Sequence, residues 1–177
     1  MKLKKYMILL LIISSLFIVQ APSKANAAIY GGRWYKHIKI YVPTTNDDVA
    51  GSFGIAISSW NKALAATGSS IRILQVYSSS EANVTVRNED YLGMPVGIAT
   101  LYPSNASSEY TSGLIQINLN KFRDLSVAQQ TTCATHELGH ILGLADSPEG
   151  SNSVMASLLN SLIFPTSFDK SELDRIY

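Results

Sequence analysis

Two histidines and a glutamate stand in the stretch HELGH at residues 136–140, and their spacing suits metal chemistry. On an α-helix, residues i and i+4 lie on the same face, so His136 and His140 can offer ring nitrogens to one zinc ion at about 2.0–2.1 Å. Glu137 lies one residue further round the helix, where its carboxylate can accept a proton from water on the metal. The pattern predicts a zinc-dependent hydrolase with Glu137 as general base.

The third protein ligand is expected from the turn after this helix. Gly143 follows His140 by three residues and can adopt the positive φ that ends a helix and reverses the chain, which would return Asp146 toward the imidazoles. The chain has 3 histidines, and the remaining one, His37, lies far upstream in a predicted strand. Two histidines and one carboxylate leave a fourth zinc position open, as catalytic sites require.

Other interpretations of these residues remain open. Glu149, in a loop between proline and glycine, and Glu172, in the final predicted helix, are alternative carboxylate ligands. We favour Asp146 because a tight glycine turn delivers it without a second helix. Met155 follows in a Ser-Val-Met turn, and its thioether is a soft, adaptable filler beneath a metal site. An ordinary helix that matches a five-residue pattern by chance is the competing reading of HELGH.

The stretch HELGHILGLAD at residues 136–146, followed by Ser-Val-Met, resembles the metzincin clan of zinc metalloproteases. That clan has the motif HExxHxxGxxH/D and a downstream methionine-containing turn, the Met-turn. The aspartate in third position resembles the snapalysin-type enzymes, and the surrounding chain resembles bacterial matrixin-like catalytic domains. The resemblance implies zinc as cofactor, bound by His136, His140 and Asp146, with Glu137 as base and Met155 in the Met-turn.

The resemblance also implies an endopeptidase that acts on protein or peptide substrates. Many related enzymes carry a tyrosine two residues after the methionine, where it stabilises the oxyanion. Ser157 occupies this position here, so either zinc acts alone or a tyrosine from elsewhere assists. The rival functions are a secreted binding module with structural zinc, which needs a fourth protein ligand, and a zinc amidase of cell-wall peptides.

The pattern along the chain predicts an α+β fold whose N-terminal half is of α/β type. Strands are expected at 34–42, 71–77, 82–87, 97–102 and 114–119, and helices are expected from N-caps at Thr45, Ser126 and Thr166. Ser126 with Gln129 matches a capping box. A strand, a helix and a strand in succession favour parallel pairing. The resemblance implies a twisted, mostly parallel five-stranded sheet with an antiparallel edge strand, an active-site helix, a Met-turn and a C-terminal helix.

Residues 97–102 are placed at the sheet edge above the zinc. A free edge offers unpaired N–H and C=O groups that can hold an extended peptide, and the matching metzincin strand does so. The candidate substrate-binding residues are Gly97, Ile98, Ala99, Thr100 and Leu101. The alternative is an ordinary strand covered by the loop at 104–112. The apolar segment 156–164 either lines a pocket for the residue after the cleaved bond or only packs under the final helix.

The first 27 residues are typical of an export signal. Lys2, Lys4 and Lys5 precede an apolar run, and the small-residue pattern ANA ends at residue 27. The run is shorter than the roughly 20 residues of a spanning helix, so we expect cleavage after Ala27, secretion, and no membrane association afterwards. Residues 28–177 then form the catalytic domain.

Composition narrows the partners and cofactors of that domain. Removal of four lysines with the signal leaves 10 basic and 13 acidic residues, a net charge of −3, which gives no support for nucleic-acid binding. About 150 residues suit one domain, expected to be a monomer. Cys133 is the only cysteine, so no internal disulfide forms, and we expect it in the core rather than as a ligand. A calcium site at 88–90 is unsupported, because no recognisable ligand spacing is present.

Overall fold

The computed structural model describes residues 30–90, 93–103, 109–156 and 162–177. The expected signal peptide at 1–27, Ser157 and most of the apolar segment 156–164 lie outside the described residues, as does part of the loop at 104–112. Among the described residues, no helix has the length and apolar character needed to cross a membrane.

One five-stranded sheet organises the described chain. Its strands are β1 (Ile38–Tyr41), β2 (Ile73–Val76), β3 (Val84–Glu89), β4 (Gly97–Tyr102) and β5 (Ser112–Asn118). They lie in the order β2-β1-β3-β5-β4. All neighbouring pairs are parallel except β4 with β5, so β4 is an antiparallel edge strand. This confirms the predicted α+β fold and the edge position of residues 97–102.

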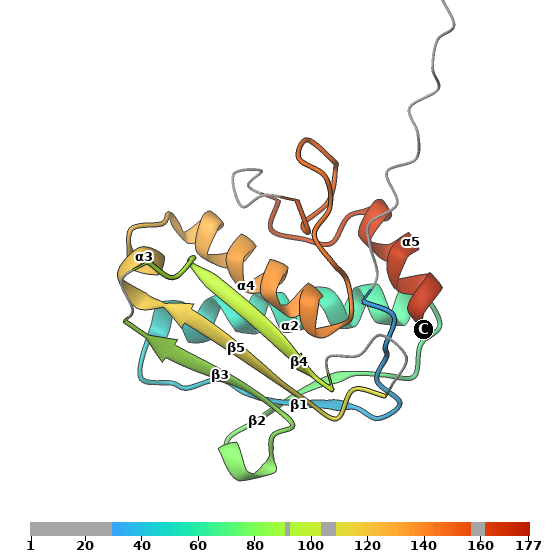
Figure 1. The fold of residues 1–177 in the computed structure, drawn as a ribbon, viewed down its shortest axis with the longest axis horizontal. Coiled ribbons are helices and arrows are strands. Elements are labelled where there is room, and N and C mark those ends of the chain that lie inside the picture. The colour runs from blue at the N-terminus through green and yellow to red at the C-terminus, as the bar shows by residue number, and fades with distance from the viewer. Residues whose placement is uncertain (1–29, 91–92, 104–108, 157–161) are drawn as a thin grey trace, which may run out of the picture.

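The helices are α2 (Asp47–Ala66), α3 (Leu119–Arg123), α4 (Val127–Ile141) and α5 (Ser167–Ile176), with a short 3-10 helix, η1 (Ser79–Glu81). Figure 1 shows α2 and α4 side by side on one face of the sheet, with α5 near the C-terminal end of α4. The candidate metal-binding stretch therefore lies on a helix that is covered on one side by the sheet and on another by α2.

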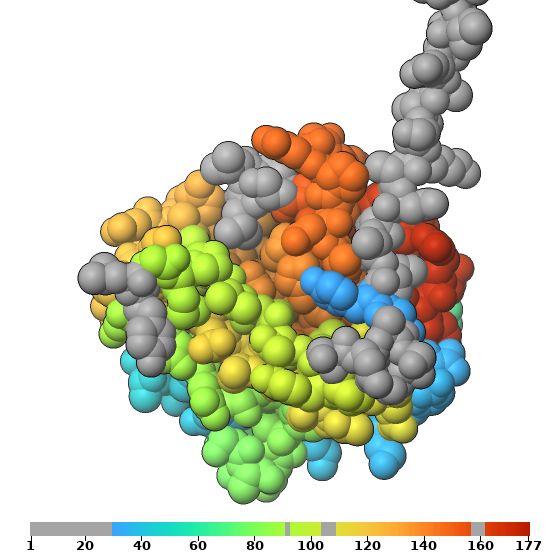
Figure 2. All heavy atoms as spheres, in the orientation of Figure 1, coloured from blue at the N-terminus to red at the C-terminus, as the bar shows by residue number. Residues whose placement is uncertain are grey.

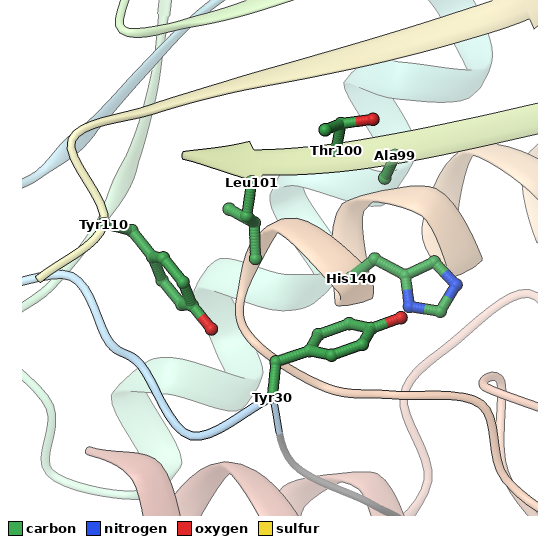
Figure 3. Close-up of a pocket in the computed structure, with 6 residues that line it drawn as sticks. All are labelled: Tyr30, Ala99, Thr100, Leu101, Tyr110 and His140. Atoms are coloured by element: carbon green, nitrogen blue, oxygen red, sulfur yellow. The ribbon is translucent and has the colours of Figure 1, made fainter. Parts of the chain in front are cut away.

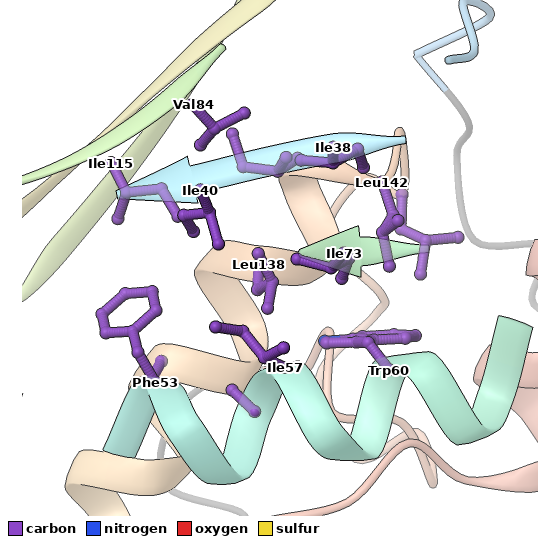
Figure 4. Packing of buried hydrophobic residues seen from close by; sticks show 14 of the residues in the cluster. Ile38, Ile40, Phe53, Ile57, Trp60, Ile73, Val84, Ile115, Leu138 and Leu142 are labelled. Atoms are coloured by element: carbon purple, nitrogen blue, oxygen red, sulfur yellow. The ribbon is translucent and has the colours of Figure 1, made fainter. Parts of the chain in front are cut away.

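The core lies between the sheet and these two helices. The stripe predicted along α2 is buried, and its Phe53, Ile57 and Trp60 point toward residues of β1, β2 and α4 in Figure 4. The indole Nε1 of Trp60 also donates to the carbonyl of Thr135 on α4, over 2.8 Å. Cys133 is fully buried in the same cluster, as expected. These contacts hold α4 in place, because Trp60 of α2 hydrogen-bonds to its backbone and its apolar face packs in the core.

Two local expectations were wrong by a few residues. The N-cap of α2 is Asn46, whose side chain accepts from the N–H of Val49, rather than Thr45. His37 lies just before β1 instead of within it, and its Nδ1 accepts from the N–H of Arg72. Both deviations arise at element ends, where competing polar side chains shift a boundary at little energetic cost.

The capping box of α4 gives a first test. Ser126 Oγ accepts from the N–H of Gln129, and the Gln129 side chain accepts from the N–H of Ser126. We predict that Ser126→Ala lowers the free energy of unfolding by about 1 kcal/mol. Urea denaturation followed by circular dichroism measures this change. Val127→Ala, at the exposed next residue, is the control and should stay close to the parent; equal stability of both variants would contradict the capping role.

Candidate metal centre

Three side-chain atoms converge at the C-terminal end of α4. His136 Nε2 and His140 Nε2 lie 3.0 Å apart, and Asp146 Oδ1 lies 3.2 Å from the first and 3.5 Å from the second. Tetrahedral zinc with bonds of about 2.0–2.1 Å places its ligand atoms about 3.3 Å from each other. The three separations thus match one shared ion, and among the described residues this is the one cluster of its kind.

Hydrogen bonds on the far side of each ring decide which nitrogen faces the cluster. His136 Nδ1 lies 3.0 Å from the carbonyl of Val154, and His140 Nδ1 lies 2.8 Å from the carbonyl of Leu144. A carbonyl oxygen only accepts, so both Nδ1 atoms carry the proton and both Nε2 atoms present lone pairs. Two lone pairs and a carboxylate oxygen pointing at one place repel each other unless a cation lies between them. The donor set therefore fits a metal ion.

The turn after α4 carries Asp146 to the histidines. The helix ends at Ile141, Leu142 is its C-cap, and Gly143 has φ 95°, which side chains other than glycine rarely adopt. His136 and His140 are 8% and 9% exposed, whereas the Asp146 side chain is 73% exposed. The two imidazoles are thus held by the core, and the carboxylate approaches from the solvent side.

Glu137 is buried beside this cluster and touches the edge strand. Burial, and next the charge of Asp146, raise its pKa to about 8, while a hydrogen bond from the backbone of Ala99 lowers it. A Cβ added at Gly97 would lie 2.6 Å from Glu137 Oε1. Glycine at this position lets the backbone of β4 approach the carboxylate. A divalent cation bound by the neighbouring ligands would favour the ionised form of Glu137, because opposite charges lower a carboxyl pKa.

The Met-turn is anchored to α5 by a buried carboxylate that sequence reasoning missed. Asp169, 1% exposed, accepts from Ser153 Oγ at 2.5 Å and from the N–H of Val154 at 3.1 Å. The same carboxylate accepts from the N–H and Oγ1 of Thr166, the N-cap of α5. Since the carbonyl of Val154 holds the His136 ring, Asp169 acts on the candidate ligand through the turn. Its capping pattern in the sequence indicates only a helix start.

Met155 packs against the backbone of α4, the helix that carries the two candidate histidine ligands. A Cβ on Gly139 would overlap the Met155 sulfur and would lie 2.9 Å from Trp60 Cζ2. Residue 139 must therefore be small, so that the Met-turn can lie against α4. The sequence shows Gly139 inside the motif but does not indicate that Met155 and Trp60 approach it closely.

The last carbonyls of α4 are satisfied by both ends of the described chain. Trp34 Nε1 donates to the carbonyl of Ile141 at 2.7 Å, and the Tyr177 hydroxyl donates to that of Leu142 at 3.1 Å. The N–H of Tyr30 donates to the carbonyl of Gly143 at 3.1 Å. A helix end without such partners would leave buried acceptors unpaired. These contacts hold the turn that leads to Asp146.

The other carboxylates considered as ligands lie outside the cluster. Glu172 is buried in α5 and forms an ion pair with Arg175 at 2.7 Å. Glu149 is exposed in the loop after the turn. The histidine cluster contains Asp146 instead, which agrees with the sequence-based choice of this residue.

Comparison with known proteins supports the fold and leaves the chemistry open. No protein-family model matches the chain. No curated protein sequence matches it significantly. A chain in the solved structure of the GM1-bound form of the ECX AB5 holotoxin has a similar fold, with a TM-score of 0.52 and 18% sequence identity over 82% of this chain and 80% of that chain. At this identity the similarity shows the fold alone.

Asp169 provides the test of this arrangement. We predict that Asp169→Asn weakens zinc binding by about 10-fold to 100-fold, because the amide cannot accept all the hydrogen bonds that hold the Val154 carbonyl on His136. Competition with a chromophoric zinc chelator measures the affinity, with circular dichroism to verify folding. Asp174→Asn, on an exposed position of the same helix, is the matched control. Unchanged affinity in folded Asp169→Asn would remove the positioning role.

Proposed function

We propose that the chain is a zinc-dependent endopeptidase of the metzincin clan. The observation that carries this proposal is the convergence of His136 Nε2, His140 Nε2 and Asp146 Oδ1 beside a buried glutamate and a free sheet edge. A structural zinc site is usually closed by a fourth protein ligand. No fourth His, Cys, Asp or Glu joins the cluster among the described residues, which favours a catalytic site over a binding module.

His136, His140 and Asp146 would hold the zinc, which when bound supplies a Lewis acid that polarises water and the scissile carbonyl. Glu137 takes a proton from the attacking water on its carboxylate as the new C–O bond forms. The same carboxyl group then gives that proton to the amine nitrogen as the C–N bond breaks. Asp146 adds a negative charge that a third imidazole would lack. Zinc in this site would therefore lower the pKa of bound water less than zinc held by three histidines.

The free edge of β4 is the proposed substrate platform. β4 pairs with β5 along one side, and its other side is the sheet edge next to Glu137. Gly97, Ile98, Ala99, Thr100 and Leu101 lie on this strand. Among the described residues no strand pairs with this side of β4, so an extended peptide can hydrogen-bond to its backbone groups, whatever the peptide's side chains are. This places a peptide bond within reach of the base without a deep cleft.

We further propose that residues 1–27 are an export signal and that residues 28–177 act outside the cell as a single, monomeric catalytic domain. The proposal is supported by the charged and apolar pattern at the N-terminus and by the one sheet-and-helix unit that the structure describes.

Replacement of the base tests the chemistry. We predict that Glu137→Ala lowers the rate of casein or gelatin cleavage by at least about 100-fold while zinc stays bound, because the proton acceptor is lost and the ligands are kept. Cleavage assays with and without a chelator, together with metal analysis of the same samples, measure both effects. Cleavage at the parental rate would rule out Glu137 as base. Hydrolysis of peptidoglycan peptides in place of proteins would favour the amidase.

Replacement of the third ligand tests the metal site itself. We predict that Asp146→Ala reduces zinc affinity by more than about tenfold, since one of three protein ligands is removed. Equilibrium dialysis or chelator competition measures the affinity. Glu149→Ala, which changes an exposed carboxylate a few residues away, should bind zinc as the parent does. The reverse ranking of the two variants would place the third ligand at Glu149.

A further inference from the structure

A small pocket lies beside His140, on the side of the candidate metal centre where β4 ends. It has a volume of about 210 Å³, and it is lined by Tyr30, Ala99, Thr100, Leu101, Tyr110 and His140 (Figure 3). Sites for drug-sized ligands are about 300–1,000 Å³. The pocket is smaller than this range, so it suits a single side chain better than a whole small molecule.

The two tyrosines that wall the pocket are held in place. The Tyr110 hydroxyl accepts from the N–H of Gly32 at 3.1 Å, and its ring packs against Trp34 with centroids 6.1 Å apart. The N–H of Tyr30 donates to the carbonyl of Gly143, and the Tyr30 ring centroid lies 5.9 Å from that of His140. Figure 3 shows Leu101 and Tyr110 directed into the space below β4, and the Tyr30 ring along the far side of this space with its hydroxyl toward His140. The pocket is thus a built feature of the fold.

Its lining favours an apolar guest. Leu101 and Ala99 contribute aliphatic surface, and the tyrosines contribute aromatic rings. Among the described residues, those that line it include no Lys, Arg, Asp or Glu. Figure 2 shows the blue N-terminal segment on the surface between the yellow-green strand β4 and the orange chain after α4. Tyr30, from this N-terminal segment, lines the pocket together with residues of β4 and with His140 of α4.

The direction of β4 relates the pocket to the cleaved bond. The strand begins at Gly97, against Glu137, and proceeds to Leu101 at the pocket. Antiparallel pairing is the slightly more stable mode of adding a strand. A peptide bound antiparallel to β4 runs the opposite way, so its residues before the cleaved bond lie beside 99–101 and its residues after that bond lie beside Gly97.

We propose that this pocket is a subsite for an apolar side chain on the N-terminal side of the cleaved bond, and that Tyr30 is its specificity-determining wall. The inference rests on the proposed peptidase function and adds a substrate preference to it. The peptide side chain displaces water from the pocket and packs between Tyr30, Leu101 and Tyr110.

The binding test uses a zinc-loaded Glu137→Ala background, so that no peptide is cleaved. The probes are two short acetylated peptides with a central Ala-Ala bond. One carries leucine and the other carries serine at the residues before that bond, and calorimetric titration measures the affinity of each. We expect the leucine peptide to bind at least about tenfold more tightly. Ala99→Leu, which fills the pocket, should abolish this advantage, and Tyr30→Ala, which opens it, should reduce it severalfold.

Tyr35→Ala is the matched control for these variants. Tyr35 is exposed in the same N-terminal segment, lies under the Arg33 guanidinium at 4.4 Å, and is absent from the pocket lining. This variant should keep the full leucine advantage. An unchanged advantage in folded Ala99→Leu and Tyr30→Ala would overturn the proposal.

Cleavage of a peptide library by the active enzyme, with the products sequenced, tests which side of the bond the pocket serves. We expect an apolar preference at one position before the cut, lost in Ala99→Leu. A Tyr30-dependent preference after the cut would overturn the assigned direction. Absence of cleavage by the zinc-loaded parent on any protein or peptide would instead overturn the proposed peptidase, and the calorimetric comparison would still decide whether the pocket takes an apolar side chain.

Discussion

The structure depends on holding three hydrogen-bond acceptors close together. The Nε2 atoms of His136 and His140 and a carboxylate oxygen of Asp146 face one point, at separations of 3.0 to 3.5 Å. With both Nε2 atoms unprotonated, such an arrangement is repulsive by itself, and a shared metal ion makes it favourable. The protein must therefore fix each ligand from outside the cluster. Backbone carbonyls of Val154 and Leu144 do this for the two rings, because they keep the proton on Nδ1.

The rest of the fold fixes those carbonyls. Val154 belongs to the Met-turn, which Asp169 binds to the start of α5, and Leu144 belongs to the turn at the end of α4. The carbonyls at the C-terminal end of α4 receive donors from Trp34 and Tyr177, and the carbonyl of Gly143 in the following turn receives the N–H of Tyr30. Segments from both ends of the described chain thus meet at one helix terminus. The two imidazoles are therefore positioned by hydrogen bonds to backbone carbonyls that are themselves held by the fold.

The sheet contributes the other half of the candidate site. β4 lies at the edge, and the glycine at its start allows its backbone to reach the buried carboxylate of Glu137. The far end of the same strand borders the pocket that Tyr30 and Tyr110 also line. One strand therefore connects the proposed base, the proposed peptide platform and the proposed specificity pocket. In the proposed function, these three roles would thus be arranged along the backbone of one edge strand.

Much of this arrangement follows from local patterns in the chain. The i, i+4 spacing of two histidines, the glycine that permits a positive φ, the capping box at Ser126, the helix start at Thr166 and the buried stripe of α2 are properties of neighbouring residues. The structure contains each of these features. They were predictable because helix geometry and backbone sterics act over a few residues. The edge position of β4 was predictable from the resemblance and was found in the sheet order.

Only the tertiary structure decided which distant residues support the site. Asp169 has the sequence signature of a helix start, yet its carboxylate also holds the Met-turn. Gly139 must be small because Met155 and Trp60 approach it from two other segments. Tyr30 precedes His140 by more than a hundred positions in the sequence, and the two rings meet only when the chain before β1 crosses the end of α4. Contacts of this kind depend on how elements pack, and the spacing of residues along the chain carries no information about that packing.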